Sequence, residues 1–339
     1  MTTRQSGLGF LNNKTVAGWL IFALVTVVLA GGSFAVVSWI AWQLVGKTPP
    51  PVKTAGYVNY NIAGDYTKSA EYAAAQKAYT AYVAQHPQPQ NVKILKGLST
   101  AQIYGYMVNQ FSGGLKVSCQ HCHNLAQGNF ADDSNPNKHI ARQMLLMSAD
   151  LNQNWITQLP VSVGNYQVAC ATCHGGAAVN FNGGKSGNLS NYPADQAPIP
   201  DNFQIKLATP ADIDYLQVTG KLNADLFDVQ YNQYVMTHMN YALGVGCAFC
   251  HNAAYFPSNE VPQKGHALVM LKMIQYLNAG QVPAQFQYSD PLYKRGVGYL
   301  AAMNNKVPSC WMCHRQAQIP PGAMENGAVP PQISSHPTQ

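Results

Sequence analysis

The longest apolar run of the chain lies near its N-terminus. Residues 16–46 contain no charged side chain, and the run exceeds the roughly 20 residues that a helix needs to cross a bilayer. The apolar region of a cleaved signal peptide is only about 7–15 residues long. The pattern therefore predicts one uncleaved transmembrane helix over 16–46.

Beyond this run, three segments combine helix-forming residues with start or stop signals. Residues 66–85 are rich in helix formers and end at the proline-rich HPQPQ. Residues 99–113 begin with a capping Ser-Thr pair and stop at two glycines, and a further helix has Pro136 near its start. Strand patterns are weak. The predicted fold class is mainly α with much irregular structure.

All eight cysteines fall into four CxxCH motifs, and none lies outside them. The motifs are Cys119, Cys122 and His123; Cys170, Cys173 and His174; Cys247, Cys250 and His251; and Cys310, Cys313 and His314. Two thiols at this spacing reach the two vinyl groups of one porphyrin, and the following histidine then lies under the iron as proximal ligand. The sequence predicts four covalently bound haem c groups.

Two other uses of paired cysteines explain the motifs less well. A zinc ribbon brings two CxxC pairs together about 15–20 residues apart, whereas successive motifs here lie more than 50 residues apart. A thioredoxin-like CxxC is expected once, in a βαβ context. Neither use requires a histidine after every second cysteine. His121, inside the first motif, is interpreted as a filler of the variable pair.

Thioether haem is generally assembled outside the cytoplasm, and this decides the predicted topology. The short N-terminal tail (1–15) is expected in the cytoplasm and the haem-bearing part on the periplasmic side of the membrane. Since every cysteine is committed to haem, no disulfide is expected. Charged residues make up 10% of the chain and the net charge is +6, with the lysines dispersed, so nothing indicates a nucleic-acid partner.

The two halves of the haem-bearing part resemble each other. CQHCHNLA from Cys119 matches CAFCHNAA from Cys247, and HIARQMLLMSADLN from His139 parallels GHALVMLKMIQYLN from Gly265. A pseudo-repeat of two dihaem lobes is the simplest consequence. The predicted organisation is a cytoplasmic tail (1–15), an anchor (16–46), a linker with a helical segment (47–98), lobe 1 (99–178), an irregular connection (179–224), lobe 2 (225–318) and a proline-rich tail (319–339).

Each haem iron also needs a sixth ligand, and methionine gives a higher potential than a second histidine. Met107 lies on a predicted helix about 12 residues before Cys119, and Met236 occupies the equivalent place before Cys247. We assign these two methionines to the first and third irons. Met239 and His238 are near alternatives to Met236.

The second iron is assigned to a later helix. Met144 and Met147 lie one turn apart on it, and Met144 is preferred. The repeat then nominates Met270 for the fourth iron. His139 and His266, at matching positions of the repeat, are the rival ligands for a fourth haem with two histidines.

These motifs resemble the tetrahaem cytochrome subunit of photosynthetic reaction centres. The resemblance covers about residues 99–315 and rests on the four CxxCH motifs, the methionine-bearing helix before them and the stretch ARQMLLM…NQNW. It implies partners: reaction-centre L and M type subunits with their bacteriochlorophyll pair, and a soluble donor such as a blue copper protein or a cytochrome c. Light-harvesting subunits could contact the transmembrane helix.

Two departures from the family pattern are visible. Many relatives are held by a lipidated N-terminal cysteine, which this chain lacks, and the predicted span resembles the form found in filamentous anoxygenic phototrophs. Well-studied relatives also take the distal histidine of the fourth haem from the segment between the second methionine and the second motif. Here residues 148–169 contain no histidine. Either Met270 takes that place, or His139 or His266 does.

The predicted function is therefore electron transfer without substrate chemistry. As a subunit of a photosynthetic complex, the chain would re-reduce the photo-oxidised bacteriochlorophyll pair. The alternative is an enzyme, a membrane-anchored tetrahaem quinol dehydrogenase, which also has one N-terminal span and four CxxCH motifs. Those chains are much shorter and use mostly histidine ligands, so the long spacing and the helical methionines argue against the alternative.

Overall fold

The computed structural model describes part of the chain. It covers residues 57, 68–125, 128–164, 166–176, 178, 225–296, 298–303 and 308–325. All of them belong to the larger of two compact units, Thr54–Gln339. The predicted cytoplasmic tail, anchor and irregular connection lie outside the described residues. No helix among the residues that are described has the length and apolar character needed to cross a bilayer.

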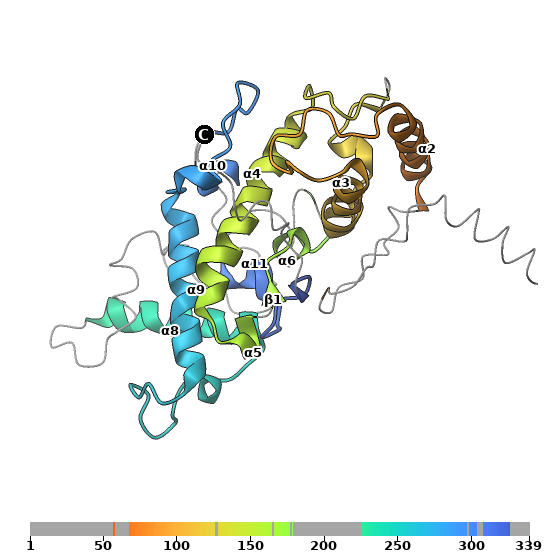
Figure 1. Cartoon of the computed structure of the whole chain (residues 1–339). Coiled ribbons are helices and arrows are strands. Elements are labelled where there is room, and N and C mark those ends of the chain that lie inside the picture. The colour runs from red at the N-terminus through yellow and green to blue at the C-terminus, as the bar shows by residue number, and fades with distance from the viewer. Residues whose placement is uncertain are drawn as a thin grey trace, which may run out of the picture. The chain divides into compact units, whose positions relative to one another are not determined.

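The described part is mainly helical, as the sequence predicts (Figure 1). Its longer helices are α2 (Ala70–Gln85), α3 (Thr100–Tyr106), α4 (Pro136–Asp150), α8 (Leu226–Leu243) and α9 (Pro262–Ala279). Short helices are α5 (Val161–Gly164), α6 (Cys170–His174), α10 (Tyr299–Ala302) and α11 (Cys310–His314). The π-helical segments are η2 (Met107–Gly113) and η5 (Leu151–Trp155), and the 3-10 turns are η3 (Cys119–His121), η6 (Ile156–Gln158), η10 (Cys247–Phe249) and η11 (Ala284–Phe286). The two strands, β1 (Tyr166–Gln167) and β2 (Met324–Glu325), pair antiparallel, with Tyr166 opposite Glu325.

Local sequence explains why the helix before the first motif forms. Ser99 caps α3 in a reciprocal capping box, in which its hydroxyl accepts from the Gln102 backbone and the Gln102 side chain accepts from the Ser99 backbone. From Met107 the helix continues in π-helical form to Gly113, the end that the sequence predicts. Such π-helical turns are frequent at functional sites. Met107 is thus the first residue of the irregular part.

The core lies between α4 and α9, which run side by side in Figure 1. Gln143 of α4 is buried and binds the chain that follows α9: its amide donates to the Phe286 oxygen at 3.0 Å and its oxygen accepts from the Tyr288 backbone at 2.7 Å. Buried apolar side chains fill the rest, among them Leu145, Leu146, Leu151, Leu271, Ile274, Leu277 and Tyr299. Burying them supplies the main stabilisation of this region.

Helices and CxxCH motifs alternate in the order that the sequence predicts. The order is α3 with η2, the first motif, α4, the second motif, α8, the third motif, α9 and the fourth motif. The first and third motifs begin in 3-10 turns, whereas the second and fourth form short α-helices. Corresponding motifs of the two predicted lobes therefore share a backbone conformation. A symmetry relation between the lobes stays a prediction.

The described residues reach into the segment predicted as a proline-rich tail. Ala323 and Met324 are 2% and 3% exposed, and Met324 is the first residue of β2. Gly322 has φ +86°, and a Cβ there would lie 2.6 Å from the backbone carbon of Ala171. Only glycine permits this close approach to the second motif. The start of the predicted tail therefore packs against a haem anchor.

Candidate functional site

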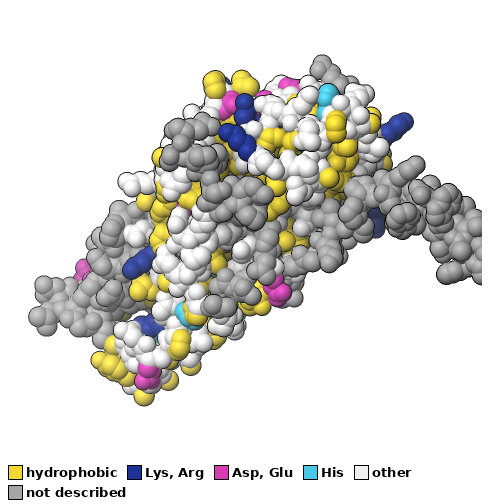
Figure 2. All heavy atoms as spheres, viewed as in Figure 1, with side chains coloured by type: hydrophobic (Ala, Val, Ile, Leu, Met, Phe, Trp, Pro, Cys, Tyr) yellow, Lys and Arg dark blue, Asp and Glu magenta, His cyan; other side chains and the backbone are white. Residues whose placement is uncertain are grey.

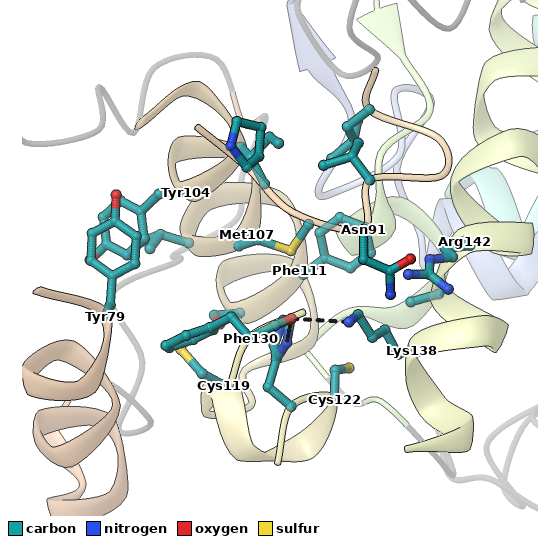
Figure 3. Close-up of a pocket in the computed structure, with 18 of the residues that line it drawn as sticks. Tyr79, Asn91, Tyr104, Met107, Phe111, Cys119, Cys122, Phe130, Lys138 and Arg142 are labelled. Atoms are coloured by element: carbon teal, nitrogen blue, oxygen red, sulfur yellow. Dashed lines mark hydrogen bonds between the residues drawn. The ribbon is translucent and has the colours of Figure 1, made fainter. Parts of the chain in front are cut away.

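The first CxxCH motif opens onto a large, mainly apolar cavity. Met107, Cys119, Cys122 and His123 all line it, and it contains about 1240 Å³ of space that no protein atom fills, part of it open to solvent. In Figure 3, Met107 lies across this space from the two thiols. Apolar and aromatic side chains form most of the remaining wall, including Ile103, Tyr104, Val108, Phe111, Val117, Phe130 and Leu145. These residues fit a c-type haem, because both thiols, the proximal histidine and a thioether face one apolar space.

Hydrogen bonding orients the His123 ring for metal binding. Its Nδ1 lies 3.1 Å from the Phe130 carbonyl oxygen. A carbonyl can only accept, so Nδ1 carries the proton and the lone pair is on Nε2, which is the usual arrangement of a ligating histidine. Burial, together with the Lys138 cation, lowers the pKa of His123 to about 4. The ring is therefore neutral at physiological pH, as a metal ligand must be.

Two other proximal histidines are held in the same way. His251 Nδ1 lies 2.9 Å from the Phe256 carbonyl oxygen, and His314 Nδ1 lies 2.9 Å from that of Ala317. Burial lowers the pKa of His314 as well. His174 ends α6, whose C-cap is the left-handed Gly175. In at least three of the four motifs, Nε2 is thus the ring nitrogen that would be available to bind a metal.

Two lysines support these histidines, and the sequence analysis did not single them out. Lys138 Nζ donates to the Phe130 oxygen at 3.0 Å, and Lys264 Nζ donates to the Phe256 oxygen at 3.1 Å. Each carbonyl therefore accepts from a proximal histidine and from an ammonium group. The signal was present in the sequence: both lysines stand two residues after the proline that begins α4 or α9, in PNK and PQK.

The second and fourth motifs lie against each other although 140 residues separate them. Cys173 Sγ is 3.2 Å from Cys313 Sγ, which is a non-bonded contact and not a disulfide. Arg315 donates to the Ala171 oxygen at 3.4 Å, across the same boundary. The two attachment points are therefore neighbours in the fold.

The first and third motifs lie on either side of this central pair. The Gly176 amide donates to the Gly114 oxygen at 3.2 Å, which joins the end of η2 to the second motif. The Gln316 amide donates to the Ala242 oxygen at 2.7 Å, which joins the fourth motif to α8, and the third motif follows α8. Gly244 ends α8 at φ +65°, where a Cβ would lie 2.6 Å from the Gln316 oxygen. The contacts thus join the helix before the first motif to the second motif, and the fourth motif to the helix before the third.

The segment that leads into the second motif is fixed to the helix that carries Met144 and Met147. Asn152 holds Val168 from both sides, donating to its oxygen at 2.9 Å and accepting from its amide at 2.7 Å. Ser148 also donates to the Val168 oxygen, at 2.6 Å. These bonds place Cys170 close to the end of α4. The arrangement agrees with a second-haem ligand on α4, although it does not choose between the two methionines.

Exposure separates the candidate sixth ligands. A ligand side chain must border the space of the porphyrin, so protein atoms cannot enclose it completely. The four predicted methionines meet this condition, all being partly exposed: Met107, Met144, Met236 and Met270.

Two of the alternative histidine ligands and one alternative methionine do not border such a space. His139 and His238 are 1% and 0% exposed, and Met239 is 8% exposed. Both ring nitrogens of His139 also make hydrogen bonds, Nδ1 with the Tyr288 hydroxyl at 3.0 Å and Nε2 with the Asp133 oxygen at 2.8 Å. His266 is partly exposed and remains compatible with a ligand role.

Most of these thiols differ from redox or zinc-binding cysteines. Burial raises the pKa of Cys122 and Cys310 to about 11 and that of Cys170 to about 12, whereas reactive cysteines have depressed values. Cys173 is the exception, because its contact with Cys313 lowers its pKa. Among the residues that the structure describes, no three His, Cys, Asp or Glu side chains converge in a metal cage. These cysteines suit covalent attachment through uncharged sulfur.

The family comparison agrees with this site. The sequence profile described as "Photosynthetic reaction centre cytochrome C subunit" matches residues 54–188 and 219–328. Cytochrome c-554 of Chloroflexus aurantiacus is 29% identical, over 86% of this chain and 85% of its own length. The photosynthetic reaction center cytochrome c subunit of Rubrivivax gelatinosus is 28% identical over 82% of each chain, and that of Thermochromatium tepidum is 24% identical over 80% of this chain and 72% of its own. The profile covers well over half of the chain, which therefore belongs to the family of photosynthetic reaction centre cytochrome c subunits.

Proposed function

We propose that this chain carries four haem c groups and donates electrons to a photosynthetic reaction centre. The observation that carries the proposal is the first cavity, where Met107, Cys119, Cys122 and His123 face one apolar space. The family supports the same conclusion, because relatives that match most of this chain are named photosynthetic reaction center cytochrome c subunits. In this role the chain is an electron carrier without substrate chemistry.

Each CxxCH motif would hold one haem through two thioethers and its proximal histidine. When bound, haem c supplies a one-electron couple of iron. The chain's own residues attach it, fix the histidine tautomer through a backbone carbonyl and exclude water with apolar walls. We assign the sixth ligands to Met107, Met144, Met270 and Met236 for the first, second, fourth and third motifs. Methionine in all four places gives four haems on the high-potential side of the range that axial ligands set.

The order of the motifs suits a relay. The contacts described above connect the helix before the first motif to the second motif, the second motif to the fourth, and the fourth to the helix before the third. The first and third motifs therefore lie at the two ends of the row. We place the soluble donor at one end of the row and the bacteriochlorophyll pair, held by L and M type subunits, at the other.

Charge favours the first motif as the donor end. Residues 68–142 contain seven Lys or Arg and three Asp or Glu. Residues 225–325 contain six Lys or Arg and five Asp or Glu. Figure 2 shows that charged side chains are few among the apolar and other uncharged ones on the surface in view. Exposed apolar side chains follow the third motif, where Tyr255 and Phe256 are 63% and 49% exposed. A basic end suits a mobile acidic partner, and an apolar end suits a lasting contact.

Association with the reaction centre makes the chain a membrane-associated protein. We assign the attachment to a single span over 16–46, with residues 1–15 in the cytoplasm and the haem-bearing part outside it. The same span would offer a contact for light-harvesting subunits. The donor is a blue copper protein or a soluble cytochrome c.

Haem content is the direct test of this proposal. We expect the mature chain to show the added mass of four haems, and its pyridine haemochrome spectrum to give four haem c per polypeptide. Flash excitation of native membranes should oxidise haem c within microseconds. A chain without added cofactor mass, or with an iron that readily binds carbon monoxide in the native state, would contradict the proposal.

A further inference from the structure

A guanidinium group in the wall of the first haem cavity is only partly used by the protein. Arg142 of α4 lines this cavity together with Met107 and His123. Its Nη1 donates to the Tyr288 hydroxyl at 2.8 Å and to Asp133 Oδ2 at 3.0 Å, and its Nη2 donates to Asp133 Oδ1 at 2.7 Å. A guanidinium carries five N–H donors. The other two, on Nε and Nη2, have no acceptor among the residues that the structure describes.

The two remaining donors lie on one edge of the guanidinium plane. Asp133 takes the fork between Nη1 and Nη2, which leaves the Nε–H and the outer N–H of Nη2 side by side. Such an edge matches the two oxygens of a carboxylate and binds them bidentately. The Arg142 side chain is 11% exposed and borders the cavity, so little bulk water competes for these donors. The edge therefore suits one more carboxylate.

The charges at this wall are also unbalanced. Lys138 and Arg142 bring two positive charges, and within the described part of the chain both form an ion pair with the single carboxylate of Asp133. The three N–H groups of Lys138 already address Asp133 Oδ1 and two backbone oxygens. Lys93, another cation that lines the cavity, is exposed, so water screens its charge. The unmatched positive charge of the partly buried wall therefore lies with Arg142.

A c-type haem brings two carboxylates into such a cavity. Its propionates are on the two pyrrole rings opposite those that carry the vinyl groups, so thioethers to Cys119 and Cys122 leave the propionates at the far edge of the porphyrin. In Figure 3 the two thiols lie at the bottom of the cavity, and Arg142 lies above them at its side. We propose that Arg142 binds a propionate of the first haem through its Nε–H and Nη2–H groups. The inference rests on the proposed haem attachment.

The third haem site lacks this group. When the lysines of PNK and PQK are aligned, Leu268 stands in the place of Arg142 and is 40% exposed. Asn259 likewise stands in the place of Asp133. Two uncharged residues thus replace the ion pair of the first site as a unit. A bound guanidinium offsets the negative charge of a propionate, which otherwise favours oxidised iron, so Arg142 raises the potential of the first haem.

Resonance Raman spectra and redox titration of the four-haem protein test the inference together. The bending band of a haem propionate reports the hydrogen bonds that its carboxylate accepts. Asp133→Asn leaves Arg142 in place, so this band should keep its wild-type position. Asp133→Asn/Arg142→Leu gives the first site the residue pair of the third. In this double variant the band of one haem should shift, and the midpoint potential that Met107→His also moves should fall relative to Asp133→Asn.

Two further variants separate charge from direct contact. Arg142→Lys keeps the positive charge but cannot bind both oxygens of a carboxylate from one edge. The propionate band should therefore shift, while the midpoint changes less than with leucine. Lys93→Gln removes another cation of the cavity wall and should leave the band in place.

The outcomes distinguish the possible errors. An unchanged propionate band in Asp133→Asn/Arg142→Leu or in Arg142→Lys, in protein that holds four haems, would show that Arg142 serves only Asp133. A band shift in Lys93→Gln would assign the propionate to Lys93 and overturn the inference. If the double variant does not fold, Arg142→Lys, which retains a cation beside Asp133, decides alone. A wild-type chain without any haem wave would instead disprove the proposed function.

Discussion

Lys264 and His251 bind the same backbone oxygen. Lys264 Nζ lies 3.1 Å and His251 Nδ1 lies 2.9 Å from the carbonyl oxygen of Phe256. Lys138 and His123 repeat the arrangement around the Phe130 oxygen. A neighbour that binds the second nitrogen of a ligating histidine fixes its orientation and adjusts its basicity. Here that neighbour is the carbonyl, and each lysine acts on it, so we assign both lysines to the proposed haem sites.

The two lysines differ in how their charge is balanced, and this leads to a prediction. Lys138 pairs with Asp133 at 2.9 Å, whereas Lys264 donates to three backbone oxygens and forms no ion pair within the described part of the chain. We expect Lys264→Met to lower the potential of the third haem by an amount on the order of tens of millivolts, because a nearby cation disfavours oxidised iron.

Redox titration measures this effect, and Lys272 supplies the control. Lys272 is exposed on the same helix, so Lys272→Met should leave the four midpoints in place. Lys138→Met should give a smaller shift than Lys264→Met, since Asp133 already offsets the charge. Equal midpoint potentials in the Lys264→Met and Lys272→Met proteins would contradict the proposed effect of Lys264 on the third haem.

The assignment of Met107 to the first iron predicts a large change of one potential. Met107→His should lower a single midpoint by a substantial part of the roughly 0.8 V range that axial ligands cover, because histidine stabilises oxidised iron better than a thioether does. Met239→Leu is a suitable control, since Met239 is 8% exposed and packs in the core. Four unchanged midpoints in Met107→His would show that another residue ligates this iron.

Asp133 predicts a pH-dependent stability. Although burial opposes ionisation, hydrogen bonds from Arg142 at 2.7 and 3.0 Å and the Lys138 ammonium hold the pKa of Asp133 well below its usual range. Asp133→Asn should lower the free energy of unfolding by about 1.5–3 kcal/mol, a typical contribution of hydrogen bonds to charged groups.

Denaturant unfolding at several pH values checks the sign. Because the pKa of Asp133 is depressed in the folded state, its contribution is complete above the unfolded value of about 3.9 and is lost as the pH falls further. The difference between wild type and Asp133→Asn should therefore be present at pH 7 and shrink below about pH 4. A difference that persists unchanged in acid would exclude an electrostatic origin.

The basic end of the chain predicts a charge-dependent reaction with small redox probes. Lys93 is exposed on the loop that lines the first cavity. Lys93→Glu should slow oxidation of the reduced protein by anionic ferricyanide about two-fold or more at low ionic strength and accelerate oxidation by a cationic cobalt(III) complex. Both effects should fade above about 0.15 M salt, where the Debye length is about 8 Å.

Stopped-flow mixing measures these rates. Lys272→Glu makes the same charge change on α9, away from the loop that lines the first cavity, and should alter the rates less. If the two variants behaved alike, net charge and not the local basic surface would explain the result.

The sequence alone gives the four CxxCH motifs, from which haem attachment is predicted, and the positions of the helices around them. Two thiols, a histidine and their spacing are covalent, local information, and so are the caps of α3 and the proline that starts α4. The structure confirms the predicted helices, because helix signals act within a few residues. The predicted sixth ligands follow from helix position and stay predictions.

Only the tertiary structure shows which residues from different elements are in contact. Cys173 meets Cys313 across 140 residues, and Tyr299 meets Asp150 across 149. No periodicity encodes such contacts, since they depend on how helices pack around a shared core. The same packing encloses His139 and His238 and leaves Met107 at the edge of a cavity. Local signals thus name the residues that can bind haem, and packing decides which of them border the space that a haem requires.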